Sequence, residues 1–348
     1  MIRTWQESLQ SFFHPRVVTM VFFGFSAGLP ILLIFSSLSL WLREAGVERS
    51  AVTFFSWAAL GYSFKFVWAP LVDRLPNPFL TRLLGRRRSW IIAAQAGVIT
   101  AILWMGFTDP ATGQYPLTMM AMAAVMLGFS SATQDIVIDA YRIESAQIDL
   151  QALMASAYIG GYRIGMLVAG AGALFLAQLF GSIKGNYRYE AWQITYCIMA
   201  AFMLVGIITA LFVSEPGVEE IEGKRYTPKD YLGSLFLFAL AVAGFILTFH
   251  FTADMAADLK GSLGVLLSNK PLAGLLVEVI RLGFGISVAA VIGKIAMATG
   301  GVNKKMVIDS YLAPVSDFFN RYGVFLAWLI LALIGLYRIS DIVLGVIS

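Results

Sequence analysis

The sequence is poor in the residues that build disulfides and metal centres. It has one cysteine, Cys197, and two histidines, His14 and His250. A single cysteine excludes an internal disulfide and a cysteine-rich metal cluster, and two distant histidines give no metal-ligand spacing. The sequence has no Gly-x-x-x-x-Gly-Lys-Ser/Thr loop and no evident nucleophile with its base. We therefore expect no ATP hydrolysis, no cofactor and no enzymatic activity.

Charge is also scarce. Charged residues make up 13% of the chain, against roughly 25% in soluble domains. Hydrophobic residues make up 59%, and the mean hydropathy is +0.77. This composition predicts an integral membrane protein in contact with lipid. The net charge is only +4, and the arginines stand between apolar segments instead of forming a basic domain. Nucleic-acid binding is therefore not expected.

Apolar segments long enough to cross a hydrocarbon core of ~30 Å as helices recur along the chain. They predict an all-α polytopic membrane protein with spans at 17–41, 51–72, 89–107, 117–141, 153–180, 192–213, 231–252, 271–297 and 322–347. The polar stretch 214–230 is the clearest boundary. We expect a six-helix bundle over 1–213, a linker over 214–230, two inserted helices with loops over 231–321, and the first helix of a second half over 322–348.

Lysines and arginines before residue 231 are distributed unequally between the two sides of the predicted membrane. If the N-terminus is cytoplasmic, 11 lie in inside segments and 4 in outside loops. Cytoplasmic loops of membrane proteins carry the excess of these residues. The pattern predicts a cytoplasmic N-terminus.

Four charged residues fall at a similar depth in the inner half of the predicted spans: Lys65, Asp135, Asp139 and Arg163. Asp135 and Asp139 are four residues apart and share a helix face. Two cations and two anions at one depth can form a static network that only holds helices together. Alternatively, one aspartate exchanges a proton as its surroundings change, and Asp135, the deeper of the two, is then favoured. Both hypotheses, a static network and proton exchange, remain open. The spans 231–252 and 271–297 show no comparable set of polar residues.

The loop after the second span contains Asp73-Arg74 and, further on, Gly85 followed by Arg86, Arg87 and Arg88. This pattern resembles the signature of the major facilitator superfamily between helices two and three, although ten residues with two prolines lengthen the gap. The basic cluster also serves as a signal for orientation. The resemblance implies a cytoplasmic latch formed by Asp73 with Arg74, Arg86 and Arg87. Arg142 is expected at the same rim.

Three stretches together, 64–74, 85–90 and 132–142, resemble AmpG-type muropeptide permeases, which are related to acetyl-CoA transporters. The similarity covers the first 213 residues. It implies a symporter in the bacterial inner membrane that imports GlcNAc-anhydroMurNAc, with or without peptide, together with protons, and so serves peptidoglycan recycling and β-lactam resistance.

The second half of such a transporter is missing. We expect a C-terminally truncated chain, or one that needs a partner to close the path. Another solute carrier, such as an acetyl-CoA transporter, and a non-transporting scaffold or regulatory fragment remain alternatives.

A bulky sugar-peptide needs hydrogen-bonding and aromatic groups along its path. The candidates in the predicted spans are Ser26, Lys65, Gln134, Tyr158, Tyr162 and Arg163. An arginine can hold the carboxylates of a peptide as a bidentate partner. Glycines and serines in these spans are equally explained by close helix packing. Gln134, an amide beside an aspartate, is the stronger candidate among the neutral residues.

Overall fold

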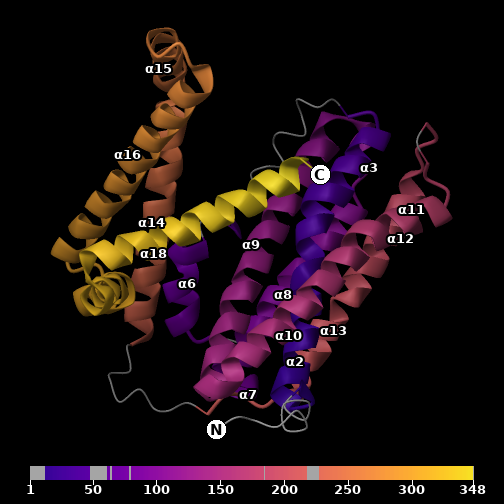
Figure 1. The fold of residues 1–348 in the computed structure, drawn as a ribbon, viewed down its shortest axis with the longest axis horizontal. Helices are drawn as coiled ribbons and strands as arrows, with labels where there is room; N and C mark the ends of the chain where they lie inside the picture. Colours follow the sequence, from indigo (N-terminus) through magenta and orange to yellow (C-terminus); the bar gives the residue numbers. More distant parts are fainter. Residues whose placement is uncertain are drawn as a thin grey trace. The chain divides into compact units, whose positions relative to one another are not determined.

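The computed structural model describes residues 12–47, 61–62, 65–77, 80–183, 185–217 and 227–347 (Figure 1). The chain divides into two compact units, Met1–Glu222 and Gly223–Ser348. Within the described residues both units are helical, with one isolated bridge between Ile183 and Asn186. The predicted all-α fold is confirmed.

Unit 1 contains five described helical spans long and apolar enough to cross a membrane: Pro15–Glu44, Arg86–Gly106, Gln114–Ser145, Ile148–Leu179 and Tyr189–Phe212. They confirm five of the spans predicted before the linker. Their helices are α2 (Pro15–Leu32), α3 (Leu38–Glu44), α8 (Arg86–Gly106), α9 (Gln114–Ser145), α10 (Ile148–Leu167), α11 (Ala173–Leu179), α12 (Tyr189–Phe202) and α13 (Leu204–Phe212). Residues 51–60 and 63–64 of the predicted second span, 51–72, lie outside the described part, and α6 (Lys65–Arg74) forms its end. The short helix α7 (Thr81–Leu84) follows.

The helices α2 and α10 pack directly on one another through glycines. Each carries two glycines four residues apart, Gly24 and Gly28 in α2 and Gly161 and Gly165 in α10. A Cβ atom built on any of the four would lie 2.0–2.2 Å from a carbonyl oxygen of the other helix. No side chain fits in that space, so the close approach depends on glycine.

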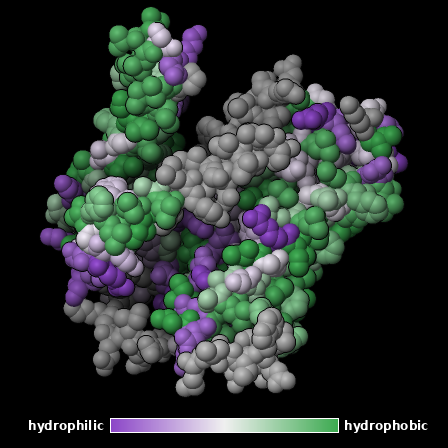
Figure 2. All heavy atoms as spheres, in the orientation of Figure 1, coloured by the Kyte–Doolittle hydropathy of each residue, from purple (hydrophilic) through white to green (hydrophobic). Residues whose placement is uncertain are grey.

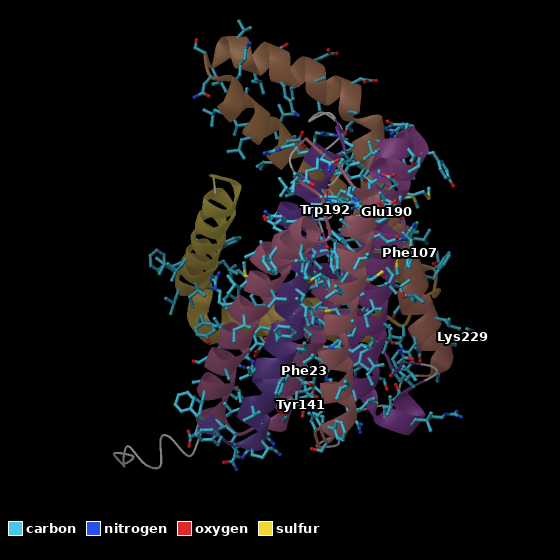
Figure 3. All side chains as sticks on the ribbon, turned by 90° about the vertical axis from the view of Figure 1, so that its right-hand side faces the viewer. Phe23, Phe107, Tyr141, Glu190, Trp192 and Lys229 are labelled. Atoms are coloured by element: carbon cyan, nitrogen blue, oxygen red, sulfur yellow. The ribbon has the colours of Figure 1, made fainter. Side chains whose placement is uncertain are left out.

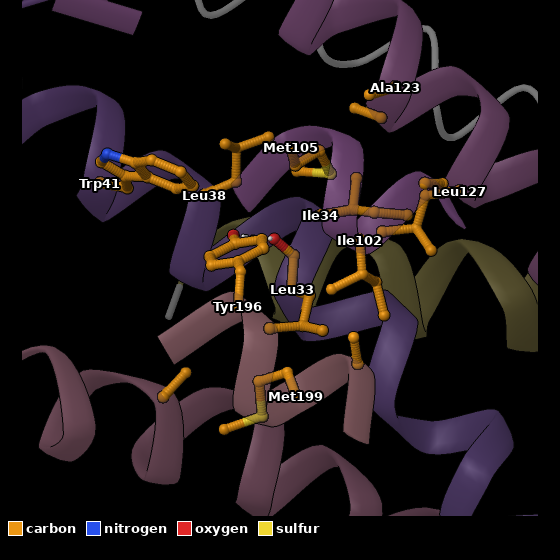
Figure 4. Close-up of a cluster of buried hydrophobic side chains, with 14 of the residues drawn as sticks. Leu33, Ile34, Leu38, Trp41, Ile102, Met105, Ala123, Leu127, Tyr196 and Met199 are labelled. Carbon is orange, nitrogen blue, oxygen red and sulfur yellow. Dashed lines mark hydrogen bonds between the residues drawn. The ribbon is translucent and has the colours of Figure 1, made fainter. Parts of the chain in front are cut away.

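The hydrophobic core of unit 1 is formed by the C-terminal end of α2, by α3 and α12, and by parts of α8 and α9 (Figure 4). Trp41 stacks on Trp192 with the rings 5.5 Å apart and only 1° from parallel. The buried Tyr196 hydroxyl donates to the Leu33 carbonyl at 3.0 Å. Leu33 begins a π-helical turn, Leu33–Ser37. A second π-helical turn, Val168–Gly172, contacts it. The Ser37 hydroxyl donates to the Ala169 carbonyl at 2.7 Å. Side-chain hydroxyls thus satisfy carbonyls where both helices are irregular.

Unit 2 begins with α14 (Pro228–Phe251). A capping box precedes it, in which the Thr227 hydroxyl accepts from the Asp230 N–H and the Asp230 carboxylate accepts from the Thr227 N–H. The antiparallel helix α16 (Lys270–Ala298) packs on α14, and both regions can span a membrane, which confirms two more predicted spans. Between them lies α15 (Ala253–Leu266), in a stretch for which only loops were expected. Its acidic and basic residues kept the mean hydropathy low, but they do not prevent a helix. Figure 2 shows hydrophobic side chains over the hairpin that these helices form.

The chain continues through α17 (Lys304–Val307) and a π-helical turn, Ile308–Leu312, into α18 (Ala313–Ile347). Gly323 interrupts α18 with φ 71° and ψ 158°, a conformation that glycine adopts readily. The predicted span 322–347 therefore corresponds to the part of α18 that follows this break.

Candidate functional site

Asp135 of α9 lies in an ion pair inside unit 1. The Nζ atom of Lys65, at the start of α6, is 3.8 Å from Asp135 Oδ2. The hydroxyl of Tyr158, in α10, donates to Asp135 Oδ1 at 3.2 Å. The carboxylate is 14% exposed and the lysine side chain 32%. Three helices thus contribute to one partly accessible charged group, which is compensated as an ionisable residue in a membrane span must be.

Aromatic side chains surround this pair. The rings of Tyr158 and Tyr162, one helical turn apart, have centroids 6.1 Å apart. Tyr62 interacts electrostatically with both Asp135 and Tyr162. On the neighbouring turn, the Trp68 indole donates to the Thr133 hydroxyl at 3.2 Å. A cation, an acceptor and several amphipathic rings can bind a polar solute that has both hydroxyl groups and apolar faces.

The other predicted members of the inner charged layer lie elsewhere. Asp139 is 52% exposed and pairs with Arg142 of its own helix at 3.1 Å. Arg163 is exposed, and its Nη1 atom lies 3.8 Å from the Met166 sulfur. Arg163 follows Tyr162 by one residue, a rotation of about 100° on a helix. The structure therefore joins Lys65 with Asp135 but does not bring the four charges into one group.

Two predicted substrate ligands are fully buried. Ser26 and Gln134 have 0% exposure, and the Ser26 hydroxyl donates to the Phe23 carbonyl at 3.0 Å. Gln134 is also rotated by about 100° from Asp135 on α9. Of the predicted binding residues, the structure gathers Lys65, Tyr158 and Tyr162 around Asp135 and leaves Ser26, Gln134 and Arg163 outside that group.

A second charged cluster occupies the end of unit 1 where α8 begins. Arg87, 4% exposed, has Nη1 at 2.7 Å from Asp73 Oδ1, and its Nε atom donates to Glu144 Oε2 at 2.8 Å. Arg86 reaches the same glutamate at 3.2 Å. The predicted association of Asp73 with the arginines therefore occurs through Arg87. Arg142 pairs with Asp139 instead, and the side chain of Arg74 lies outside the described residues.

Glu215 fixes the beginning of α8. Its carboxylate accepts the backbone N–H groups of Arg87 at 2.7 Å and Arg88 at 3.1 Å. An anion at a helix N-terminus satisfies free donors and interacts favourably with the helix dipole. Gly85, with φ 86°, leaves room for it, since a Cβ there would lie 2.4 Å from the Glu215 Cδ atom. Our sequence analysis missed Glu144 and Glu215, although each is an acidic residue at the same end of a span as the arginines.

The opposite end of unit 1 carries polar contacts that we also did not predict. The Glu44 carboxylate accepts from the Trp192 indole at 2.9 Å and the Ser182 hydroxyl at 2.7 Å. Tyr187 donates to Asp109 at 2.6 Å. Burial and this acceptor raise the pKa of Tyr187, so it remains a donor at neutral pH. Figure 3 shows Trp192 at this end and the contact of Phe23 with Tyr141 near the other.

Unit 2 differs from the expectation that its spans lack a set of interacting polar residues. Its two spans do carry a polar group, because Glu278 of α16 pairs with Lys260 of α15 at 2.6 Å and with Arg281 at 3.0 Å. The Arg281 guanidinium also lies 4.6 Å from the centre of the Phe249 ring and donates to the Phe249 carbonyl at 2.6 Å. The sequence spacing of three between Glu278 and Arg281 was the available signal.

Comparison with known proteins identifies relatives of unit 1. The family model described as acetyl-coenzyme A transporter 1 matches residues 16–215. A Rickettsia conorii protein that bears the name AmpG 4 is 36% identical over 200 residues, which is 58% of this chain and 45% of that protein. The anhydromuropeptide permease of Escherichia coli K12 is 38% identical over 210 residues, 60% of this chain and 40% of the permease. The chain thus spans less than half the length of these curated relatives.

Proposed function

We propose that this chain, which belongs to the acetyl-coenzyme A transporter 1 family, takes part in importing muropeptides together with protons across a bacterial inner membrane. The substrate class is suggested by the anhydromuropeptide permease of Escherichia coli, 38% identical over 210 residues. The observation that carries the proposal is the Lys65–Asp135 pair, partly accessible among tyrosines within a bundle of membrane-spanning helices. Ionisable residues at such positions commonly mark the path of a substrate or an ion.

Asp135 is the proposed proton carrier. With Lys65 at 3.8 Å and the Tyr158 hydroxyl at 3.2 Å, its charged form is compensated. The other titratable groups near it are Tyr62, Tyr162 and, on its own helix, Asp139. When a movement of α6 or a substrate carboxylate removes Lys65, an apolar interior favours the neutral, protonated acid. Proton uptake would then accompany substrate binding. The alternative is a static pair that only joins α6 to α9.

The cluster of Asp73, Arg87 and Glu144 is the proposed latch. It joins the end of α6 to the beginning of α8 and the end of α9. With a cytoplasmic N-terminus this is the cytoplasmic end of unit 1. Breaking these ion pairs would let α6 move relative to α8 and α9, and would thereby alter the distance from Lys65 to Asp135.

A transport assay tests the proposal. The chain, alone and joined to the remaining portion of the Escherichia coli permease, is reconstituted into liposomes with labelled GlcNAc-anhydroMurNAc and an inward proton gradient. We expect gradient-driven uptake by the joined protein. Asp135→Asn should abolish this uptake without preventing membrane insertion. Asp139→Asn is the matched control, because Asp139 is half exposed and paired within its own helix.

Other results of the transport assay would favour a different function. Equal gradient-driven uptake by the two Asn variants and the unmodified protein contradicts proton transfer by Asp135. Uptake of acetyl-coenzyme A in place of the muropeptide supports the second candidate, which the name of the family favours. An inserted protein that takes up neither solute contradicts transport and favours a scaffold.

A further inference from the structure

Tyr62 carries a buried titratable group that the proposed proton transfer does not use. Its hydroxyl oxygen reaches no solvent and has no hydrogen-bond partner among the residues that the structure describes. The same is true of the hydroxyl of Ser131, a residue with 0% exposure. Buried polar groups in proteins are almost always hydrogen-bonded. Two unpaired hydroxyls inside unit 1 therefore require an explanation.

Two contacts with α9 bracket Tyr62 in the chain. On one side, a Cβ on Gly61 would lie 2.9 Å from the carbonyl carbon of Gly128, so backbone meets backbone there. On the other side, Lys65 Nζ lies 3.8 Å from Asp135 Oδ2. Tyr62 thus lies where its part of the chain packs against the segment of α9 that leads from Gly128 to Asp135.

The Tyr62 hydroxyl faces the surface of α9 that carries Asp135. Ser131 precedes Asp135 by four residues within α9, so the two side chains share a face of this helix. Tyr62 interacts with both of them. The hydroxyls of Tyr62 and Ser131 are neighbours but do not form a hydrogen bond of normal geometry in this state. A phenol oxygen without a donor therefore stands beside the carboxylate.

The two protonation states of Asp135 need different partners. An ionised carboxylate only accepts, and the Lys65 ammonium and the Tyr158 hydroxyl are its donors here. A protonated acid also donates, through its own O–H. The ammonium of Lys65 has no lone pair and cannot accept that hydrogen bond. The hydroxyl of Tyr62 can accept it and can donate to Ser131 Oγ at the same time.

We propose that the Tyr62 hydroxyl accepts the hydrogen bond of protonated Asp135 and so holds the proton on the carrier. The inference rests on the proposed function, in which Asp135 carries the proton, and it makes Tyr62 a positioning residue. When Lys65 leaves, a proton from water forms the O–H bond on the carboxylate, and Tyr62 keeps its own proton. When Lys65 returns, the proton goes back to water. The other titratable groups around this pair are Tyr158, Tyr162 and Asp139.

Infrared spectroscopy of the detergent-purified chain tests the hydrogen bond without transport. Lys65→Met removes the cation, and the C=O band of protonated Asp135, assigned by its loss in Asp135→Asn, is followed against pH. Adding Tyr62→Phe should lower the midpoint of this titration by about 0.5–1 pH unit, since the neutral acid loses its acceptor. Tyr158→Phe should raise the midpoint, because that hydroxyl donates to the charged form. Tyr115→Phe, at an exposed position of α9, should leave it unchanged.

Ser131→Ala is a second variant that tests the same hydrogen bonds. It removes the group to which Tyr62 donates, so it should lower the midpoint by less than Tyr62→Phe does. Neither substitution should lower the Tm, because neither hydroxyl has a hydrogen-bond partner among the described residues. A structural role alone would instead lower the Tm and leave the midpoint in place.

Two results for Tyr62→Phe would overturn the inference. An unchanged midpoint means that Tyr62 does not bind the protonated acid, and a higher midpoint means that it donates to the carboxylate instead. The uptake assay separates this inference from the proposed function. Proton-driven uptake by the joined protein, with an unchanged infrared midpoint in Tyr62→Phe, overturns the inference alone. A lowered midpoint, with no uptake by the joined protein, supports the hydrogen bond and overturns the proposed function.

Discussion

At the scale of single residues, Arg87 connects α8 with α6, with α9 and with the segment that follows α13. Its guanidinium, 4% exposed, contacts Asp73 near the end of α6 and Glu144 at the end of α9, while its backbone N–H donates to Glu215. A planar group with donors in a fixed fork can hold two carboxylates at once, which lysine cannot do in the same geometry. The arginine run therefore has a structural centre, and its members are not interchangeable.

We predict that Arg87→Ala lowers the free energy of unfolding by about 2–4 kcal/mol, because it leaves two carboxylates without their cation. The loss stays below that of a fully buried pair, since Asp73 and Glu144 reach solvent. Arg87→Lys should fall between Arg87→Ala and the unmodified chain. Denaturant or thermal unfolding in detergent measures the effect. Arg82→Ala, at an exposed position of α7, is the control; equal losses at both positions would contradict the assignment.

At the scale of elements, the contact between α2 and α10 rests on backbone approaching backbone. Carbonyl oxygens of Tyr158, Tyr162, Val21 and Phe25 lie where Cβ atoms of the four interface glycines would be. Without a hydrophobic driving force between helices in lipid, such close packing is a main source of association. The same contact positions Tyr158 on the neighbouring face of α10, where its hydroxyl donates to Asp135, and Tyr162 beside Tyr158.

Gly161→Ala should therefore separate α2 from α10 and destabilise unit 1 by about 1–3 kcal/mol, the usual cost of overpacking. A built Cβ at Gly161 lies 2.0 Å from the Val21 carbonyl oxygen, whereas Gly160 has open space around it. Gly160→Ala thus changes the helix propensity equally but adds no collision. Thermal unfolding of the two variants compares them directly. A Gly161→Ala protein as stable as Gly160→Ala would show that the helices do not approach this closely.

At the scale of the whole molecule, the protein is a multi-pass membrane protein with seven spans among its described helices. The bilayer requires each span to satisfy its own backbone, and helices do so. Orientation rests on the arginines and lysines of the connecting segments, which lie mainly at one end of unit 1. The loop at η3, Pro110–Thr112, is at the other end of α8 from α7.

A cysteine-labelling experiment checks the proposed cytoplasmic N-terminus. In a Cys197→Ser background, Ala111→Cys should react with a membrane-impermeant maleimide in intact cells. Arg82→Cys, at the other end of α8, should react only after the membrane is opened. Both positions are exposed in the structure, so access is decided by the membrane. The reverse pattern would place the N-terminus outside.

The class of fold, the position of most spans and the charged loop between α6 and α8 could be predicted from the sequence. Length, apolar composition and the rise of a helix suffice for these, because the lipid environment permits few alternatives. Residues that must act as pairs are harder to predict. The cost of a charge inside a membrane singled out Asp135 and Asp139 together, and only their depth favoured Asp135.

Which charges meet depends on how the helices pack on one another. Rotation by about 100° per residue separates Gln134 from Asp135 and Arg163 from Tyr162, so a depth argument cannot tell which side chains share a space. The partners Glu144 and Glu215 come from the ends of other spans, 57 and 128 residues from Arg87. The packing of α2 on α10, at glycines whose neighbours are backbone atoms, fixes the rotation of α10. Local sequence specifies each helix, whereas contacts between helices specify the site.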